Sequence, residues 1–96
     1  MIRDFHCPDT QTLFEHGTCR RFNGIARIAV RKLAQLNAAE TLDFLRAPPG
    51  NRLEALKGDR KGQRSIRLSS AYRAIYAVVN DVASFVSVEE VHKHDY

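Results

Sequence analysis

The stretch SIRLSSAYRAIYAVVNDVASFVSVEEV, residues 65–91, decides the fold class of this chain. Residues 65–69 alternate polar and apolar side chains, which is typical of a strand with one buried face. Residues 72–79 are rich in aromatic and β-branched residues, and a return strand is expected over 82–91. Asn80-Asp81 between them can form a two-residue hairpin turn, although the usual glycine is missing. The C-terminal half is therefore expected to form an antiparallel sheet.

The N-terminal half carries helix signals instead. Asp9 is a good N-cap for a short helix that Gly17 would end. A longer helix is expected to begin after Asn23, another good N-cap, and to end at Asn37. Its apolar residues recur at helical spacing, namely Ile25, Ile28, Ala29, Leu33 and Leu36. A short third helix is expected over 40–45.

The remaining segments complete the expected architecture. Residues 1–5 can form a short edge strand, Pro48-Pro49-Gly50 ends helical structure, and residues 52–56 alternate weakly. Helices followed by strands predict an α+β fold, with helices packed on one face of a small antiparallel sheet. The other face can then carry basic side chains. Ninety-six residues suffice for one domain, so we expect one over 1–96.

Positive charge is concentrated in the middle of the chain. From Arg46 to Arg73 there are eight Lys or Arg and two acids, a net of +6 where the whole chain has +4. Such a local charge is typical of a surface that binds a polyanion, and RNA is the obvious candidate. No stretch approaches a membrane span and the N-terminus lacks a secretory pattern, so we expect a cytoplasmic protein without a membrane partner. Cys7 and Cys19 are then expected to be reduced thiols.

The loop LKGDRKG, residues 56–62, is the first candidate binding element. Its two glycines permit a tight, exposed path, around which Lys57, Arg60 and Lys61 would project. Cations in such an arrangement can stabilise charge that builds up on phosphoryl oxygens. The alternative is an inert, solvated hairpin loop.

Arginines on neighbouring strands form the second candidate. Arg67 lies on the polar side of its expected strand, and Arg73 interrupts an apolar run in the next one. A cation in the centre of a strand is unfavourable unless it is paired or faces a cleft. The alternative to a binding role for Arg73 is a structural ion pair with Glu89 or Glu90 on the following strand.

Histidines supply the third candidate, because the last five residues of the chain include His92 and His94. Histidine is the usual general acid or base at neutral pH, although chain ends are commonly frayed. A zinc site is not expected, because the N-terminal histidines and cysteines lack the paired spacing of structural zinc sites.

Several blocks of the sequence together resemble a known family. They are MIRDF (1–5), LFEHG (13–17), AVRKL (29–33), PPGNRL (48–53), LKGDR (56–60), SIR (65–67) and YR (72–73). The chain is similar over essentially its whole length to the HigB branch of the RelE/ParE toxin superfamily, the plasmid-maintenance-killer type of protein. The resemblance implies the same α+β fold and the toxin half of a type II toxin–antitoxin system.

The resemblance also implies partners and an activity. Such toxins pair with a helix-turn-helix antitoxin, here a HigA-like protein, and the complex binds operator DNA. Alone, they enter the ribosomal decoding site and inhibit translation by cleaving the messenger. The cleavage is a metal-independent attack of a 2′-hydroxyl on the adjacent phosphate, and it needs no cofactor.

Carried over by position, Lys57 and Arg73 match residues that the family uses around the scissile phosphate, and His94 matches the histidine of its C-terminal tail. Arg60, Lys61, Arg64 and Arg67 would hold RNA, and His92 is the other acid or base candidate. Glu54 stands where a histidine is usual, and His92-Lys93 stand where aspartate and tyrosine are usual. Two alternatives stay open, a superfamily member that poisons DNA gyrase and a non-catalytic RNA-binding module.

Overall fold

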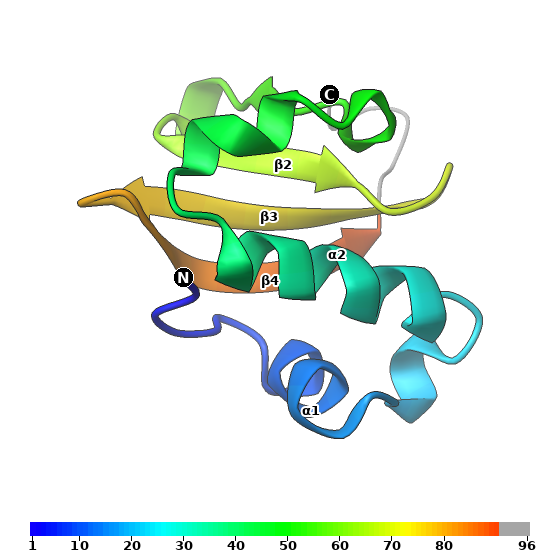
Figure 1. Cartoon of the computed structure of the whole chain (residues 1–96). Coiled ribbons are helices and arrows are strands. Elements are labelled where there is room, and N and C mark those ends of the chain that lie inside the picture. The colour runs from blue at the N-terminus through cyan, green and yellow to red at the C-terminus, as the bar shows by residue number, and fades with distance from the viewer. Residues whose placement is uncertain (91–96) are drawn as a thin grey trace.

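A computed structural model describes residues 1–90 of the chain, apart from the side chain of Pro49. Two helices, α1 (Pro8–His16) and α2 (Ala26–Ala38), precede a four-stranded antiparallel sheet (Figure 1). The strands follow in spatial order as β1 (Glu54–Ala55), β2 (Gln63–Arg67), β3 (Tyr72–Val79) and β4 (Val82–Glu90). The predicted α+β arrangement is therefore confirmed. No helix in residues 1–90 has the length and apolar character needed to cross a membrane.

Four short 3₁₀ turns link these elements: η1 (Arg20–Phe22), η2 (Leu42–Arg46), η3 (Pro49–Asn51) and η4 (Gly58–Arg60). The third helix expected over 40–45 is η2, a 3₁₀ helix rather than an α-helix. The strand expected over 52–56 has only two paired residues in β1. The expected N-terminal edge strand is reduced to two isolated parallel bridges to β4, from Ile2 and Phe5.

Both predicted N-caps are wrong, and local geometry explains why. Helix α1 starts at Pro8 with Cys7 as its cap, because proline suits the first helical position, where no N–H is needed. Helix α2 starts at Ala26 instead of directly after Asn23, because residues 20–22 have already turned into η1, whose carbonyl accepts the Asn23 N–H at 3.4 Å. The predicted stop at Gly17 is confirmed, since this residue adopts a left-handed φ of 79°.

The β3–β4 hairpin matches its prediction closely. Asn80 and Asp81 have φ values of 51° and 62°, the double left-handed turn that joins two antiparallel strands with native twist. The Asp81 carboxylate also accepts the backbone N–H of Leu42 at 3.1 Å. The turn therefore anchors the beginning of η2 to the far end of the sheet.

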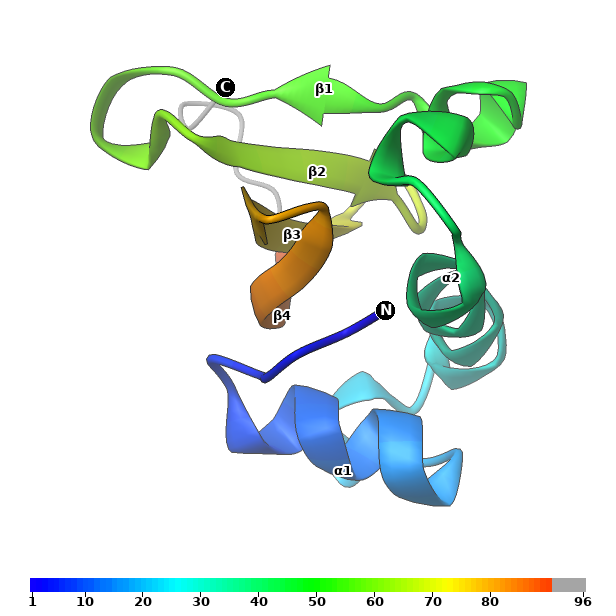
Figure 2. The same cartoon turned by 60° about the vertical axis from the view of Figure 1, so that its left-hand side comes forward.

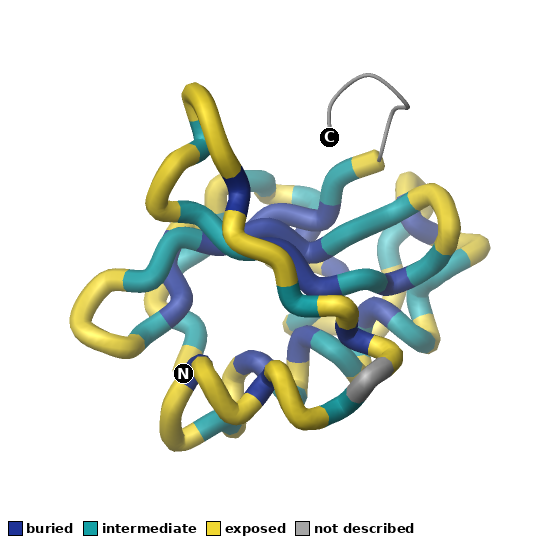
Figure 3. The backbone as a smooth tube through the Cα atoms, turned by 90° about the horizontal axis from the view of Figure 1, so that it is seen from above, coloured by how far each residue is buried: buried dark blue, intermediate teal, exposed yellow. Residues whose placement is uncertain are grey.

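The core lies between α2 and one face of the sheet. Ala29, Leu33 and Leu36 form the buried stripe of α2, and Ile66 and Tyr76 meet it from the strands. Helix α1 packs beside α2 near β4 (Figures 1 and 2). Seen from above, buried positions follow the strands and the connecting loops are exposed (Figure 3). Since both helices use the same side, the opposite face of the sheet is left to the loops.

Candidate active site

The two faces of the sheet are separated by strand alternation. Ile66 pairs with Ala74, and both belong to the core that α2 covers. One residue further along, Arg67 lies directly opposite Arg73 in the β2–β3 register, and Arg73 lies opposite Glu89 in the β3–β4 register. Because neighbouring strand residues point to opposite faces, this row of charged residues lies on the face away from α2.

The Arg73 guanidinium is fixed by three partners on that face. Its Nε donates to the hydroxyl of Ser65 at 2.7 Å, and its Nη2 donates to the backbone carbonyl of Arg52 at 2.8 Å. The carboxylate of Glu54 lies 3.7 Å from the same Nη2. The side chain is only 13% exposed, and Nη1 has no partner among residues 1–90. A guanidinium held this way presents free N–H groups in a defined position.

The predicted alternative to a binding role for Arg73 was a structural ion pair with Glu89 or Glu90. This ion pair does not form, and the prediction is wrong. Arg73 pairs with Glu54 on β1, while Glu89 accepts from Arg60 at 2.7 Å. The β1–β2 connection lies on the side of the sheet away from α2 (Figure 2), and its Arg60 occupies the Glu89 carboxylate.

The side chain of Arg67 differs from that of Arg73, because it makes no hydrogen bond or ion pair to any residue in 1–90 although it is half-buried. It sits directly opposite Arg73 in the β2–β3 register. Two like charges at directly opposite positions of a sheet are destabilising. Arg67 and Arg73, hereafter the guanidinium pair, therefore form a site that an anion would stabilise.

The β1–β2 connection carries the other predicted cations. It is anchored by Leu56, which is buried and donates its N–H to the carbonyl of Gln63 at 2.9 Å. Gly58 and Gly62 adopt φ values of 65° and 95°, which side-chain-bearing residues rarely do. Lys57 and Lys61 are exposed and make no ion pair within the described part of the chain. The loop thus presents two exposed ammonium groups beside the Arg60–Glu89 ion pair.

The structure separates one predicted residue from the rest. Arg64 alternates to the helix-covered side of β2, where it is paired with Asp43 at 3.1 Å. Its role in holding RNA stays a prediction, now without the neighbours that were expected for it. His92 and His94 lie outside the described residues.

The sequence did not predict the three partners of Arg73, which are Ser65, Glu54 and the Arg52 carbonyl. The signal for Ser65 was present, because it alternates with Ile66 in the same way as Arg67 does. The contribution of Glu54 depends on the β1–β2 register, which pairs it with Ser65. Two paired residues in β1 leave too short a pattern to show that register in the sequence.

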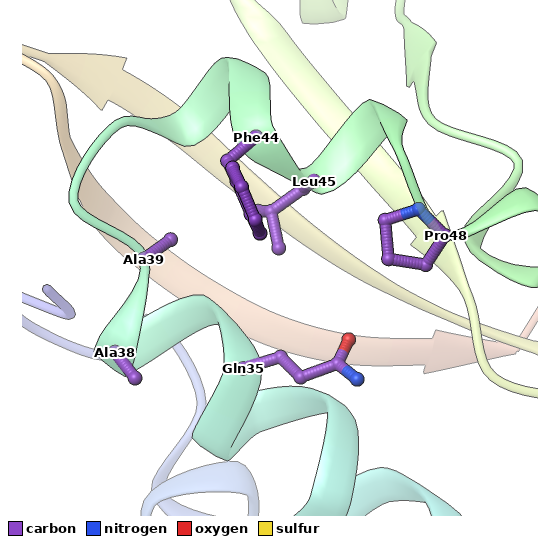
Figure 4. Close-up of a pocket in the computed structure, with 6 residues that line it drawn as sticks. All are labelled: Gln35, Ala38, Ala39, Phe44, Leu45 and Pro48. Atoms are coloured by element: carbon purple, nitrogen blue, oxygen red, sulfur yellow. The ribbon is translucent and has the colours of Figure 1, made fainter.

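A separate apolar pocket of about 240 Å³ lies on the other side of the molecule, between α2 and η2 (Figure 4). Apart from the Gln35 amide its lining is apolar: Ala38, Ala39, Phe44, Leu45 and Pro48. No titratable side chain is among these residues, so the pocket does not provide acid–base chemistry. Within residues 1–90 there is also no group of three His, Cys, Asp or Glu side chains that could hold a metal ion.

Comparison with known proteins places this sequence in a family. A sequence model described as the RelE-like toxin of the type II toxin–antitoxin system HigB matches residues 5–90. The chain belongs to this family. It is 46% identical over 61 residues to Toxin HigB-1 of Vibrio cholerae serotype O1, which is 64% of each chain. It is 32% identical over 59 residues to an uncharacterized protein of Haemophilus influenzae, covering 62% of this chain and 58% of that protein. The chain thus spans less than two thirds of the length of either relative.

Proposed function

We propose that this chain is the toxin of a type II toxin–antitoxin pair and a ribosome-dependent endoribonuclease that cleaves messenger RNA. The observation that carries the proposal is the guanidinium pair, in which Arg73 is held at 13% exposure and Arg67 opposite it has no partner in residues 1–90. Two adjacent guanidiniums offer the bidentate donors that a phosphodiester oxygen accepts. Membership of the HigB-like family supports an RNA substrate for this anion site.

The proposed reaction is attack of a ribose 2′-hydroxyl on the adjacent phosphorus. The attacking oxygen loses its proton to a base, the P–O5′ bond breaks, and the leaving oxygen takes a proton from an acid. The guanidinium pair and Lys57 would stabilise the negative charge that builds up on the phosphoryl oxygens in the transition state. The mechanism uses no metal ion or cofactor.

Glu54 is the carboxylate in the described part of the chain best placed to receive the hydroxyl proton. Its Oε2 lies 3.7 Å from Arg73 Nη2, and its side chain is 54% exposed, so substrate can reach it. It stands on β1 next to Ser65, on the same face as the guanidinium pair. His92 or His94 remains the proposed acid for the leaving oxygen.

The proposal is tested by incubating purified ribosomes, a defined messenger and the chain, and by mapping the cleavage products. Lys57→Ala and Arg73→Ala should abolish cleavage, and Arg3→Ala, which removes an exposed cation outside the site, should not. Mass spectrometry should find 2′,3′-cyclic phosphate ends, the product of 2′-hydroxyl attack. Cleavage by Lys57→Ala and Arg73→Ala at the parental rate would refute the assignment. Gyrase inhibition in a supercoiling assay, with messenger left intact, would favour the gyrase-poisoning alternative.

The partners follow from the same proposal. A toxin of this kind has to be restrained in its own cell, so we propose a HigA-like helix-turn-helix antitoxin that binds it in the cytoplasm. The toxin–antitoxin complex is proposed to bind operator DNA. The free toxin is proposed to bind the ribosome and messenger RNA.

A further inference from the structure

A second cationic segment lies outside the candidate active site. From Gly17 to Ala39 the chain contains five Lys or Arg residues and no Asp or Glu. This segment includes η1 and all of α2. Exposed helix faces usually interleave both charge signs, because pairs of opposite charge one turn apart are stabilising. The absence of any acid therefore calls for an explanation.

Two of these cations occupy the outermost line of α2. The helix buries Ala29, Leu33 and Leu36, and at 100° per residue Arg27 and Arg31 fall on the side opposite that stripe. Both are exposed, and neither side chain forms a hydrogen bond or ion pair within residues 1–90. Together with Ile28 they line an open hollow of about 400 Å³. These two residues are called the outer arginines below.

The outer arginines contribute nothing evident to the fold. Like charges four residues apart destabilise a helix by a few tenths of a kcal/mol, about 0.2–0.5. Their neighbour Lys32 differs, because its ammonium donates to the buried amide oxygen of Asn51 and links α2 to η3. The pKa of Lys32 is lowered first by burial and second by the positive charge of Arg31.

We propose that the outer arginines bind the phosphate backbone of a structured RNA, at a surface separate from the cleavage site. Four residues of α-helix advance about 6 Å, so the two long side chains can engage phosphates that lie close together on one strand. Exposed guanidiniums without carboxylate partners are free to make such contacts at once. The choice of RNA over another polyanion rests on the proposed function.

The position of this surface gives it a specific consequence. Helix α2 covers one face of the sheet, whereas the guanidinium pair lies on the other, so the two cationic surfaces point in opposite directions (Figures 1 and 2). The whole molecule measures 32 × 29 × 24 Å. It can therefore lie between two RNA segments and contact both, in which case the second contact forms at high effective concentration and strengthens the first.

The test measures binding of the chain to a short fluorescent RNA duplex by anisotropy, over a range of about 50 to 200 mM KCl. A duplex probes backbone contacts without entering the cleavage site as a flexible strand. The slope of log K against log [KCl] is negative, and Arg27→Ala/Arg31→Ala should make it shallower by about two, because each phosphate contact contributes close to one. The control Arg3→Ala removes an exposed positive charge outside both cationic segments and should leave the slope near that of the parent.

The outcomes separate the possible partners. Equal slopes for Arg27→Ala/Arg31→Ala and the control, with both variants folded by circular dichroism, would overturn the proposal. So would tighter binding of a DNA duplex of the same sequence through the outer arginines, which would assign the surface to operator DNA. Loss of antitoxin binding with RNA binding intact would overturn it in favour of a protein partner. Because no cleavage is measured, failure of the endonuclease assignment leaves this result unaffected.

Discussion

Arg67 and Arg73 are paired across the same two strands, yet their replacement by alanine should change stability in opposite directions. Arg73→Ala removes two charge-assisted hydrogen bonds, to Ser65 at 2.7 Å and to the Arg52 carbonyl at 2.8 Å. Such bonds contribute about 1.5–3 kcal/mol each, and the lower end applies to a side chain that is still 13% exposed. The ion pair to Glu54 adds little, since Glu54 is 54% exposed. The expected loss is about 3 kcal/mol.

Arg67→Ala should instead raise the free energy of unfolding slightly. Arg67 has no partner in the described residues to lose, and its removal relieves the repulsion from Arg73 directly opposite. Opposed like charges on a sheet cost about 0.5 kcal/mol, within a range of about 0.2–1. This gain should vanish near 1 M NaCl, where the screening length falls to about 3 Å. Ribosome-coupled cleavage should nevertheless fall by about 100-fold, the effect of losing one donor to a developing oxyanion.

Urea unfolding and the cleavage assay together decide the matter. With an m-value of about 1–3 kcal/mol/M, the midpoint should fall by about 1–3 M for Arg73→Ala and rise by a few tenths of a molar for Arg67→Ala. Arg67→Ala that unfolds as early as Arg73→Ala would show that Arg67 has structural partners, contrary to the geometry. Arg67→Ala that is stable and cleaves at the parental rate would remove Arg67 from the site.

Two further predictions concern the scaffold. Burial raises the pKa of Tyr76 to about 12, so between about pH 10 and that value the unfolded chain loses this proton while the folded chain keeps it, and stability should fall as the pH rises. Tyr76→Phe should abolish that fall. It should also add about 1 kcal/mol to the free energy of unfolding at neutral pH, because the buried hydroxyl has no partner in residues 1–90. A free energy of unfolding, measured with urea, that falls with alkaline pH as in the parent would contradict this. Asp81→Gly would give Asn80 the glycine neighbour that such turns favour, yet it should cost about 1 kcal/mol because the Leu42 N–H loses its acceptor. A raised thermal midpoint for Asp81→Gly would show that the turn outweighs this bond.

The sheet was predictable because its signals are local. Residues 72–79 matched β3 in full, and Asn80-Asp81 formed the expected turn, since aromatic and β-branched residues flank two residues that tolerate positive φ. The helix starts were less predictable, because here two local signals compete. Asn23 is a good cap in isolation, but the preceding 3₁₀ turn delays α2 to Ala26. Competition between two local structures cannot be decided from one favourable residue.

The candidate site shows where sequence reasoning ends. Arg73 was predictable from the sequence as a strand cation that needs a partner or a cleft. The structure gives Arg73 both a carboxylate and a buried hydroxyl as partners. The carboxylate, Glu54, was not predictable, because its contact with Arg73 depends on the register of a two-residue strand. Arg64 was grouped with Arg67 by composition, whereas alternation sends their side chains to opposite faces. The charge count therefore located the cationic segment, residues 46–73, but only the strand register shows which of its arginines share a face of the sheet.

The contrast between Arg67 and Arg73 also bears on how an anion would be bound. If both guanidiniums were free, an arriving phosphate would have to order two long side chains at the expense of their rotamer entropy. If both were engaged by carboxylates, it would have to break two ion pairs. Here Ser65 and the Arg52 carbonyl hold the Arg73 guanidinium, which has one exposed carboxylate, Glu54, at 3.7 Å, and the Arg67 side chain opposite it has no carboxylate partner in residues 1–90. A phosphate therefore meets one preorganised donor and one adaptable donor, and its binding relieves the repulsion between the two guanidiniums.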